Sequence, residues 1–343
     1  MSLSIVIVTH QSRDAVQRTL PALSGQLRDE DELIVVDNAS ADGTPAAARE
    51  LVPQAALIEA GSNLGFAAAC NLGAAAASAE LLVFLNPDAT PGEGFRDAIE
   101  RPLADRRGWA AWQGLVTAEG GRLVNTRGGV VHFTGVAWAG GAGETLGDAP
   151  TAVGEPGFVS GACLAIPRDR FEAIGGFPAD FFLYHEDVDL SLRLRLAGGR
   201  LGVEPAARVD HEYEFEKGPA KWRLLERNRW ATLIRTYPGG LLALLAPALV
   251  ATELALVPIS IADGWFGQKV AAWADLVRAT PRLRRERRAI QATRAVNARQ
   301  FAAGLTADLE SPYLGRAARS RLLRTALRAY WALVLGLLGP GRA

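Results

Sequence analysis

The stretch LSIVIVTHQSRDAVQRTLPALSGQLRDEDELIVVD, residues 3–37, decides the fold of this chain. It opens with a run rich in β-branched apolar residues, residues 3–9, which is typical of a strand buried on both faces. Apolar residues at helical spacing follow over residues 14–27, and a second apolar run covers residues 32–37. A helix between two such strands predicts that the strands pair in parallel.

The alternation of strand and helix signals continues to residue 85. We expect strands at residues 55–59 and 81–85 and helices at residues 43–51 and 66–78. This order predicts an α/β fold with a mostly parallel sheet and helices on both faces. Ligands bind such sheets at the carboxyl ends of the strands, so we expect a functional site there.

The pattern changes after residue 109. Short β-like runs alternate with Gly-rich turns over residues 109–167, which favours a mixed or antiparallel extension of the sheet. Further along, we expect a loop that enters a helix, two short strands and an Arg- and Trp-rich helix, at residues 181–197, 201–203, 208–211 and 221–237. The turn at Pro238 then separates a first domain, residues 1–237, from a helical C-terminal region, residues 238–343.

The C-terminal region begins with an apolar stretch, residues 241–262, which is long enough to span a bilayer. It contains Pro247, Pro258 and a central Glu253. An acid in the middle of a bilayer costs about 2.5–3.5 kcal/mol, whereas each Leu, Ile or Val gains roughly 0.3–0.6 kcal/mol. We therefore expect a helix or a broken hairpin that lies in the membrane interface rather than one that spans the membrane.

Charge is distributed unevenly along the chain, although the net charge is zero. Residues 264–343 contain 15 Lys and Arg but only 4 Asp and Glu, so an acidic body carries a basic tail. Such a tail favours an anionic surface such as a membrane, and the neutral chain as a whole does not indicate nucleic acid. Alternatively, these helices are solvated or pack on the first domain or on another subunit. The basic residues are a cluster of Arg278, Arg282, Arg284, Arg285, Arg287 and Arg288 and a helical face of Arg321, Arg324 and Arg328.

Two features concern the compartment. The chain has two cysteines, Cys70 and Cys163, and neither has the spacing of a metal site, so we expect them to be reduced. The first apolar run is only as long as a strand and no basic stretch precedes it, unlike a signal peptide. We expect a cytoplasmic protein, attached as a peripheral or monotopic protein to the cytoplasmic face of the cell membrane.

Polar side chains follow the strands at the expected ligand edge. Thr9 ends the first strand, Asp37 ends the second, and Asn86-Pro87-Asp88 follows the fourth. A single Asp after a strand is often only a helix cap or a turn residue. Several at one edge indicate a site, and a carboxylate after a buried strand can hold Mg²⁺ or Mn²⁺ together with substrate phosphates.

The strongest segment is FFLYHEDVDL, residues 181–190. Three acids, Glu186, Asp187 and Asp189, follow an aromatic run at the expected start of a helix. The helix dipole favours acids in the first turn, which accounts for one or two of them, and Asp189 is expected to support the helix start. A carboxylate in such a cleft can also act as a general base. His211 follows at an expected strand end, as a structural residue or a metal ligand.

Taken together, these residues resemble glycosyltransferase family 2, whose members have the GT-A fold. Within the family, the chain is similar to bacterial rhamnosyltransferase-type enzymes of cell-wall and surface-polysaccharide assembly. The resemblance covers residues 2–237, about two-thirds of the chain. It rests on SIVIVT at 4–9, VVDNAS at 35–40 with Asp42-Gly43-Thr44, NLGFA at 63–67 with Asn71 and Gly73, LNPD at 85–88, GAC at 161–163 with GGF at 175–177, the Glu186-Asp187 pair and His211.

The resemblance implies a role for each matching residue. Asp187 is expected to be the catalytic base, and Asp88 and His211 are expected to hold Mn²⁺ or Mg²⁺. Asn86 stands where the metal motif of the family has its first acid, so fewer charged ligands are available. The donor pocket is expected to be formed by Thr9, Asp37, Asn63, Gly65, Phe66, Asn71, Asp88 and Glu186.

These roles imply an inverting, metal-dependent glycosyltransferase. A hydroxyl of the acceptor would attack the anomeric carbon of a nucleoside-diphosphate sugar while Asp187 takes its proton. By resemblance, the first choice of donor is dTDP-L-rhamnose, with galactofuranosyl and hexosyl donors as alternatives. The acceptor is expected to be a glycan or a lipid-linked glycan at a membrane surface. Residues 128–147 are expected to form a loop that selects donor or acceptor, and the sequence leaves oligomer formation open.

Three other classes of protein fit less well. A nucleotide-sugar pyrophosphorylase needs a Gly-rich, basic phosphate loop after the first strand, where this chain has Gln11-Ser12-Arg13-Asp14. A dinucleotide oxidoreductase needs a Gly-x-Gly-x-x-Gly turn at the same place, which the sequence lacks. A catalytically inactive, membrane-bound sugar-binding protein would not need Asp88, Asp187 and His211 together.

Overall fold

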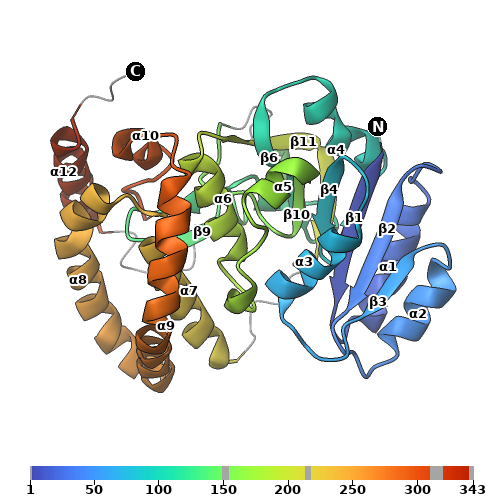
Figure 1. The fold of residues 1–343 in the computed structure, drawn as a ribbon, viewed down its shortest axis with the longest axis horizontal. Coiled ribbons are helices and arrows are strands. Elements are labelled where there is room, and N and C mark those ends of the chain that lie inside the picture. Colours follow the sequence, from blue (N-terminus) through green and yellow to red (C-terminus); the bar gives the residue numbers. More distant parts are fainter. Residues whose placement is uncertain (1, 149–153, 213–217, 310–319, 340–343) are drawn as a thin grey trace. The chain divides into compact units, whose positions relative to one another are not determined.

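The structure, a computed structural model, describes residues 2–148, 154–212, 218–309 and 320–339 (Figure 1). The chain forms two compact units. The first comprises residues 1–129, 139–194 and 199–214, and the second comprises residues 130–138, 195–198 and 215–343. The second unit begins before the expected boundary at residue 238, because helix α7 (Ala220–Thr236) packs on helix α9 (Phe266–Ala292).

The first unit is built on a mixed sheet with nine strands in the described part of the chain. As predicted, β1 (Leu3–Thr9) lies parallel to β2 (Glu32–Asp37) and to β4 (Leu81–Leu85), and β2 lies parallel to β3 (Ala56–Glu59). The order is β3-β2-β1-β4-β10-β6-β11-β5, with β7 beside β6. The later strands are β5 (Ala89–Pro91), β6 (Trp109–Ala118), β7 (Leu123–Thr126), β10 (Cys163–Pro167) and β11 (Arg200–His211), while β8 (Gly129–Val131) and β9 (Ala137–Ala139) form a separate pair.

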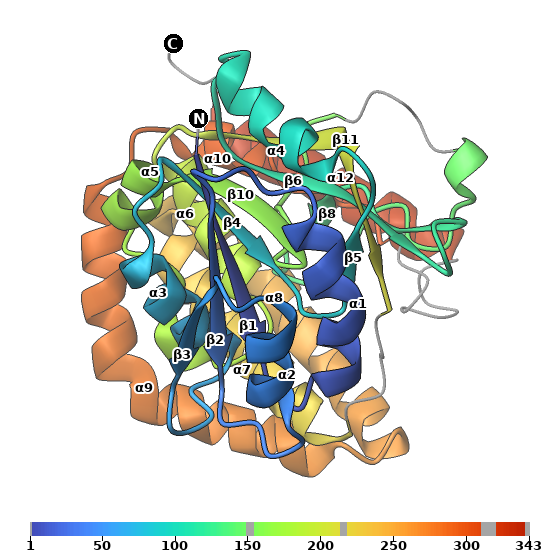
Figure 2. The same ribbon diagram turned by 90° about the vertical axis from the view of Figure 1, so that its right-hand side faces the viewer.

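Helices cover both faces of this sheet, as the sequence predicts (Figure 2). On one face lie α1 (Arg13–Ser24), α2 (Thr44–Leu51) and α4 (Phe95–Ala104). On the other face lie α3 (Phe66–Ala76), α5 (Arg168–Ala173) and α6 (Glu186–Leu196). Every residue of β1 is therefore buried, which explains its uninterrupted apolar run. Cys70 and Cys163 are both buried and free.

The two strands expected at residues 201–203 and 208–211 form one strand, β11, so that prediction was wrong. The strand pairs with β6 on both sides of a bulge, and the register shifts between Glu204 and Arg208. Pro205 lies in this bulge, where a residue without a backbone N–H breaks no ladder hydrogen bond. The bulge interrupts the apolar pattern, which is why one strand reads as two.

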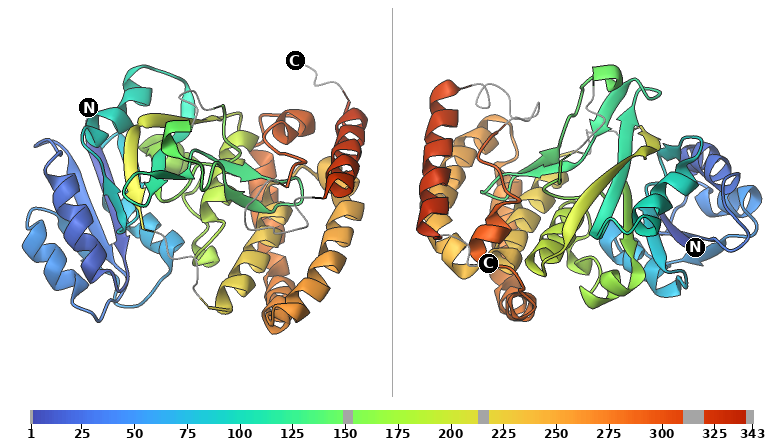
Figure 3. Two further views of the ribbon diagram at one scale, coloured as in Figure 1. Left: turned by 180° about the vertical axis from the view of Figure 1, so that it is seen from behind. Right: turned by 90° about the horizontal axis from the view of Figure 1, so that it is seen from above.

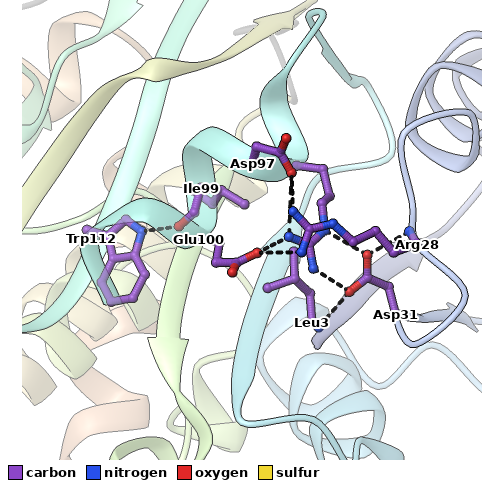
Figure 4. A network of polar contacts seen from close by, with 8 residues as sticks. Leu3, Arg28, Asp31, Asp97, Ile99, Glu100 and Trp112 are labelled. Carbon is purple, nitrogen blue, oxygen red and sulfur yellow. Dashed lines mark hydrogen bonds and ion pairs between the residues drawn. The ribbon is translucent and has the colours of Figure 1, made fainter. Parts of the chain in front are cut away.

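A buried ion pair fixes the amino end of the sheet (Figure 4). The Arg96 side chain in α4 is 2% exposed, and its Nε and Nη2 each donate to the Asp31 carboxylate at 2.8 Å. Asp31 also accepts hydrogen bonds from the backbone N–H groups of Leu3 and Arg28, each at 2.9 Å. Burial would raise the pKa of Asp31, but these donors hold it below its usual value. The pair joins α4 to the start of β1, at the opposite end of the strand from the expected site.

The second unit is helical. After α7 come α8 (Gly239–Ala262), α9, α10 (Ala298–Ala302) and α12 (Arg321–Leu337). Helix α8 continues through both of its prolines, so the expected apolar segment is a helix and not a broken hairpin. Its length and composition would allow it to cross a membrane, and among the described residues it is the one helix that meets these two criteria. Helix α12 lies beside α8 (Figure 3). Between them, Tyr330 Oη donates to the carbonyl of Leu244 at 2.5 Å.

Candidate functional site

The carboxyl ends of β1 and β2 bring Thr9 and Asp37 together. The two residues are register partners in the parallel pair. Thr9 Oγ1 donates to Asp37 Oδ1 at 2.9 Å, and the backbone N–H of Ser40 donates to Asp37 Oδ2 at 2.9 Å. The Asp37 side chain is therefore buried and held in one orientation at the predicted ligand edge.

Asn38 connects this edge to the loop that precedes α3, although no role was predicted for it. Its Oδ1 accepts from the backbone N–H of Leu64 at 2.8 Å, and its Nδ2 donates to the carbonyl of Gly65 at 3.2 Å. Asn63 supports the same loop, because its Oδ1 accepts from the N–H of Gly65 at 2.9 Å. The position of Asn38 directly after Asp37 was the only sequence signal for this role.

Gly65 occupies a position that a larger residue would strain. Its φ of +81° is left-handed, and a Cβ built there would lie 2.5 Å from the carbonyl oxygen and 2.7 Å from the Cα of Phe182. The backbone N–H of Ala67 donates to the same Phe182 carbonyl at 3.4 Å. The loop before α3 thus packs directly against the loop before α6, which joins two of the predicted motifs.

Asn71 braces the turn that precedes α6. Its Nδ2 donates to the carbonyl of Phe177, and its Oδ1 accepts from the N–H of Phe177, both at 2.8 Å. Both ends of the amide are thus engaged by one backbone residue. These two hydrogen bonds hold the turn in place, and a role for Asn71 in the donor pocket stays a prediction.

The loop before α6 has a strained backbone. Phe182, Tyr184 and His185 have φ values of 64°, 71° and 66°, which residues other than glycine rarely adopt. Such strain collects at functional sites, where the surrounding structure maintains it. Helix α6 then starts at Glu186, so the three acids lie in its first turn. Asp189 accepts a hydrogen bond from Arg193 Nε at 2.6 Å within the helix, which agrees with a structural role.

Asp187 lies at the meeting point of the two loops. Its Oδ2 accepts from the backbone N–H of Gly161 at 3.0 Å, and its Oδ1 accepts from that of Val188 at 2.8 Å. A Cβ on Gly161 would lie 3.2 Å from the ring of Phe66 and 3.8 Å from the Cβ of Asp187, so these three residues are neighbours. Burial raises the pKa of Asp187 by more than the N–H donors lower it. A carboxylate with a raised pKa is a stronger base.

Glu186 has a different environment from its neighbour. It is buried, and this burial together with the charge of Asp187 raises its pKa well above the usual value. Two carboxylates so close cannot both ionise readily. We therefore expect Glu186 to keep its proton at a pH at which Asp187 is ionised.

Asp88 and His211, the two residues expected to hold a metal ion, lie in direct contact. Strand β11 pairs with β5 so that His211 is opposite Ala89, the residue after Asp88. His211 Nε2 lies 3.0 Å from Asp88 Oδ1 and 3.3 Å from Asn86 Nδ2. Across residues 2–148, 154–212, 218–309 and 320–339, no group of three or more His, Cys, Asp or Glu side chains could hold a metal ion. A cation held by this pair would therefore need further ligands, which phosphates and water commonly provide.

Backbone hydrogen bonds link the Asp88–His211 pair to Asp187. The N–H of Asn86 donates to the carbonyl of Ala162 at 3.1 Å, and the preceding residue, Gly161, donates to Asp187. The predicted residues at the ends of β1, β2, β4 and β11 thus belong to one connected edge of the sheet. Residues 128–147 contain β8 and β9 as well as the start of a 3₁₀ helix, Leu146–Asp148. The role of this segment in the selection of donor or acceptor stays a prediction.

This chain is similar to known proteins in sequence and in fold. The model of the family described as Glycosyl transferase family 2 matches residues 4–101. An N-acetylglucosaminyl-diphospho-decaprenol L-rhamnosyltransferase of Mycobacterium tuberculosis, strain ATCC 25618 / H37Rv, is 30% identical over 240 residues, which cover 63% of this chain and 78% of the relative. The chain belongs to glycosyl transferase family 2.

Solved structures confirm the fold of this family 2 glycosyltransferase. GalNAc-T7 with UDP, GalNAc and Mn²⁺ matches with a TM-score of 0.58 at 16% identity, over 71% of this chain and 50% of that one. The mannosyltransferase PcManGT from Pyrobaculum calidifontis, in complex with GDP-Man and Mn²⁺, matches with a TM-score of 0.50 at 19% identity, over 98% of this chain and 86% of that one. The predicted GT-A class, a mostly parallel sheet flanked by helices, is therefore correct.

Proposed function

We propose that this glycosyltransferase transfers L-rhamnose from dTDP-L-rhamnose to a glycan or lipid-linked glycan, with inversion and with Mn²⁺ or Mg²⁺ as cofactor. The name of the M. tuberculosis relative supports both the sugar and a lipid-linked acceptor. Two similar structures with nucleotides and Mn²⁺ support the classes of donor and cofactor. Such a reaction serves cell-wall or surface-polysaccharide synthesis.

One observation carries the proposal, namely the connection between the Asp88–His211 pair and Asp187. Asn86 and Asp88 leave β4 together, and hydrogen bonds at Ala162 and Gly161 lead from Asn86 to the carboxylate of Asp187. A cation-binding pair and a carboxylate base at one edge of a sheet are what a sugar transfer from a diphosphate requires.

The transfer step is a single displacement. The acceptor oxygen forms a bond to the anomeric carbon while the bond from that carbon to the diphosphate oxygen breaks. The acceptor proton passes to the carboxylate of Asp187, whose pKa is raised by burial, and the nucleoside diphosphate leaves with the bonding electrons. Attack opposite the leaving group inverts the configuration at the anomeric carbon.

The side chains of Asp88 and His211 fit a divalent cation. A carboxylate oxygen and an imidazole nitrogen point at each other at 3.0 Å, and both are ligands that Mn²⁺ accepts. A bound cation would neutralise charge on the departing diphosphate. Asn86 is close enough to orient His211, while its neutral amide leaves the site with only one carboxylate ligand.

The donor pocket is assigned to the edge formed by β1 and β2. Thr9 fixes Asp37 there, and Asn63 fixes the backbone of Gly65. We assign the binding of the nucleoside to Asp37. The remainder of the donor is assigned to Gly65, Phe66 and the acidic first turn of α6. Glu186, which we expect to be protonated, would act as a hydrogen-bond donor in this pocket.

The C-terminal region is assigned to attachment at the cytoplasmic face of the cell membrane. In this proposal residues 1–237 carry catalysis and residues 238–343 carry attachment, although α7 packs with the attachment helices. A lipid-linked acceptor would be presented at the same surface.

A screen of nucleotide sugars by thermal shift, with Mn²⁺ present, tests the proposal. We expect dTDP-L-rhamnose to raise the melting temperature more than UDP-galactofuranose or UDP-hexoses do. Asp37→Ala should remove this increase, because the nucleoside loses its anchoring carboxylate at the β2 edge. If none of the nucleotide sugars stabilises the protein, the assignment of the donor site is wrong.

A further inference from the structure

A cavity lined by cationic side chains lies in the helical unit, apart from the site described above. Its volume is about 460 Å³, which is within the range of small-molecule sites. One lining residue, Gly239, starts α8, and the others come from the carboxyl-terminal part of α9 or just after it. The lining residues are Gly239, Arg284, Arg287, Arg288, Gln291 and Arg294.

The positive charge in this cavity has no protein counter-ion among the residues that the structure describes. Arg284, Arg288 and Arg294 are exposed and form no ion pair there. Arg287 is half-buried and donates through Nη1 to the carbonyls of Ile234 at 2.5 Å and Tyr237 at 2.8 Å. Burial and then the charge of Arg294 lower its pKa. Like charges held this close favour a bound anion.

The chemistry of the lining is that of a phosphate site. Guanidinium groups bind phosphate oxygens through two parallel hydrogen bonds. The first turn of α8 adds backbone N–H groups and the positive end of a 24-residue helix. Gly239 brings this turn close, because a Cβ built on it would lie 3.6 Å from Arg287 Nη2.

The exposed face of α8 indicates that the phosphate belongs to a lipid. Beyond the two glycines at its start, every exposed residue of α8 is apolar, and the side chains of Val250, Leu254 and Ile261 are 58%, 69% and 59% exposed. Soluble surfaces rarely carry so continuous an apolar face. The exposed residues after the glycines are Ala243, Ala246, Pro247, Val250, Ala251, Leu254, Ala255, Pro258, Ile259, Ile261 and Ala262.

The polar part of α8 faces the other way. Glu253 accepts hydrogen bonds from Trp230 Nε1 at 2.9 Å and from Lys269 Nζ at 2.8 Å, so it is satisfied by α7 and α9. Gly239, Ala243, Ala246 and Val250 recur at helical spacing, and the cavity therefore lies at the amino end of the apolar face. A lipid would meet both features at once, with its phosphate in the cavity and its chains along the helix.

We propose that the arginine cavity binds the phosphate head group of an anionic membrane lipid while the exposed face of α8 lies in the lipid interface. The inference rests on the membrane attachment in the proposed function and adds the residues that recognise the lipid. Binding to lipid requires neither donor nor acceptor, so it can be measured separately from glycosyl transfer.

Co-sedimentation of the full chain with vesicles tests the inference. The probes are phosphatidylcholine vesicles with and without phosphatidylglycerol. The variant Arg284→Gln/Arg288→Gln removes two cavity arginines, and Arg278→Gln/Arg285→Gln removes the same charge from the same helix outside the cavity. We expect binding to require phosphatidylglycerol and to weaken about tenfold more in the cavity variant than in the control.

Two outcomes would overturn the inference. Equal losses in both variants would show that diffuse charge, and not the cavity, attracts the membrane. Inorganic phosphate that stabilises the wild type but not the cavity variant, without binding to vesicles, would identify a free phosphate as the ligand. Thermal stabilisation by dTDP-L-rhamnose is measured as a separate control. If the donor does not stabilise the protein, the proposed donor site is contradicted, whereas the vesicle measurement still decides the lipid site.

Discussion

Glu186 and Asp187 are adjacent in the chain but differ in their hydrogen-bond donors and in what shifts their pKa values. Asp187 accepts hydrogen bonds from Gly161 and Val188, whereas Glu186 is raised in pKa by burial and by the charge of Asp187. Burial raises the pKa of both groups, and the charge of Asp187 raises the pKa of Glu186 further, so we expect Asp187 to ionise first; acid and base roles divide in this way in many active sites.

The variant Glu186→Gln is expected to become more stable than the wild type as pH rises. A group with a raised folded-state pKa contributes stability that is full below its unfolded-state pKa and is lost as pH rises through the folded-state value. The loss is about 1.4 kcal/mol for each pH unit between the two pKa values, and Gln does not incur it. Urea unfolding over a pH series measures the difference. Exposed Glu172→Gln is the control, and the same pH dependence in both variants would contradict the account.

The variant Asp88→Asn is expected to bind Mn²⁺ more weakly than the wild type. It removes the carboxylate whose Oδ1 lies 3.0 Å from His211 Nε2, so the Mn²⁺ concentration for half-maximal activity should rise by at least about tenfold. Asp97→Asn, an exposed change on α4, should leave that concentration unaltered. A normal Mn²⁺ titration for Asp88→Asn would remove this residue from the metal site.

Strand ends made many site residues predictable. Thr9, Asp37 and Asp88 each follow a buried apolar run, and the parallel topology places such positions at one edge. Gly161 was quoted only as part of a motif, because its contribution is a backbone N–H and no side-chain pattern signals it. The contact of Asp88 with His211 depended on resemblance, since antiparallel pairing of β5 with β11 cannot be read from spacing.

Among the elements, the two loops that meet at Gly65 and Phe182 set the geometry of the site. The variant Gly65→Ala is expected to destabilise the protein more than Gly61→Ala does. Both glycines have a positive φ, which costs Ala about 1–2 kcal/mol, but only Gly65 would also place a Cβ within 2.7 Å of the Phe182 backbone. The additional cost should be about 1–3 kcal/mol in urea unfolding. Equal losses in the two variants would show that the loops separate easily.

Element positions were predictable where apolar periodicity is strong. The four parallel strands were predicted to within one residue at either end. Three of them, β1, β2 and β4, are buried on both faces and therefore have almost uninterrupted apolar runs. The short β5 and the helix α4 were not predicted. The three residues of β5 are too few to show a period, and the register shift in β11 gave one strand the appearance of two.

At the scale of the whole molecule, Glu253 decides how the apolar helix α8 is accommodated. Lys269 is fully buried, the Arg229 side chain is 3% exposed, and both cations pair with Glu253 and with Glu226. Glu253, an acid that would be costly in the middle of a bilayer, is therefore part of a network among α7, α8 and α9. The network explains how α8 keeps one face on protein and leaves the opposite face apolar.

The variant Glu253→Ala is expected to cost about 3 kcal/mol, because it leaves two buried cations with one acid between them. Glu59→Ala, which removes an exposed partner of the exposed Arg49, should cost only about 0–1 kcal/mol. Chemical unfolding of the two variants provides the comparison. A loss below 1 kcal/mol for Glu253→Ala would show that the network does not hold α8 in place.

Domain organisation was only partly predictable. The turn at Pro238 marks the start of α8, but it does not mark the change of compact unit, because α7 belongs with the helices that follow. The Arg- and Trp-rich composition of α7 gave no indication of its partner, which depends on tertiary contacts with α9.

The central claim is that Asp187 accepts the proton from the acceptor at an edge shared with Asp88 and His211. The direct test is the rate of sugar transfer by Asp187→Asn, measured with dTDP-L-rhamnose and Mn²⁺ alongside donor binding by thermal shift. The account predicts a rate that falls by about 10²–10⁴-fold while the donor still stabilises the protein. Transfer at the wild-type rate by this variant would contradict it.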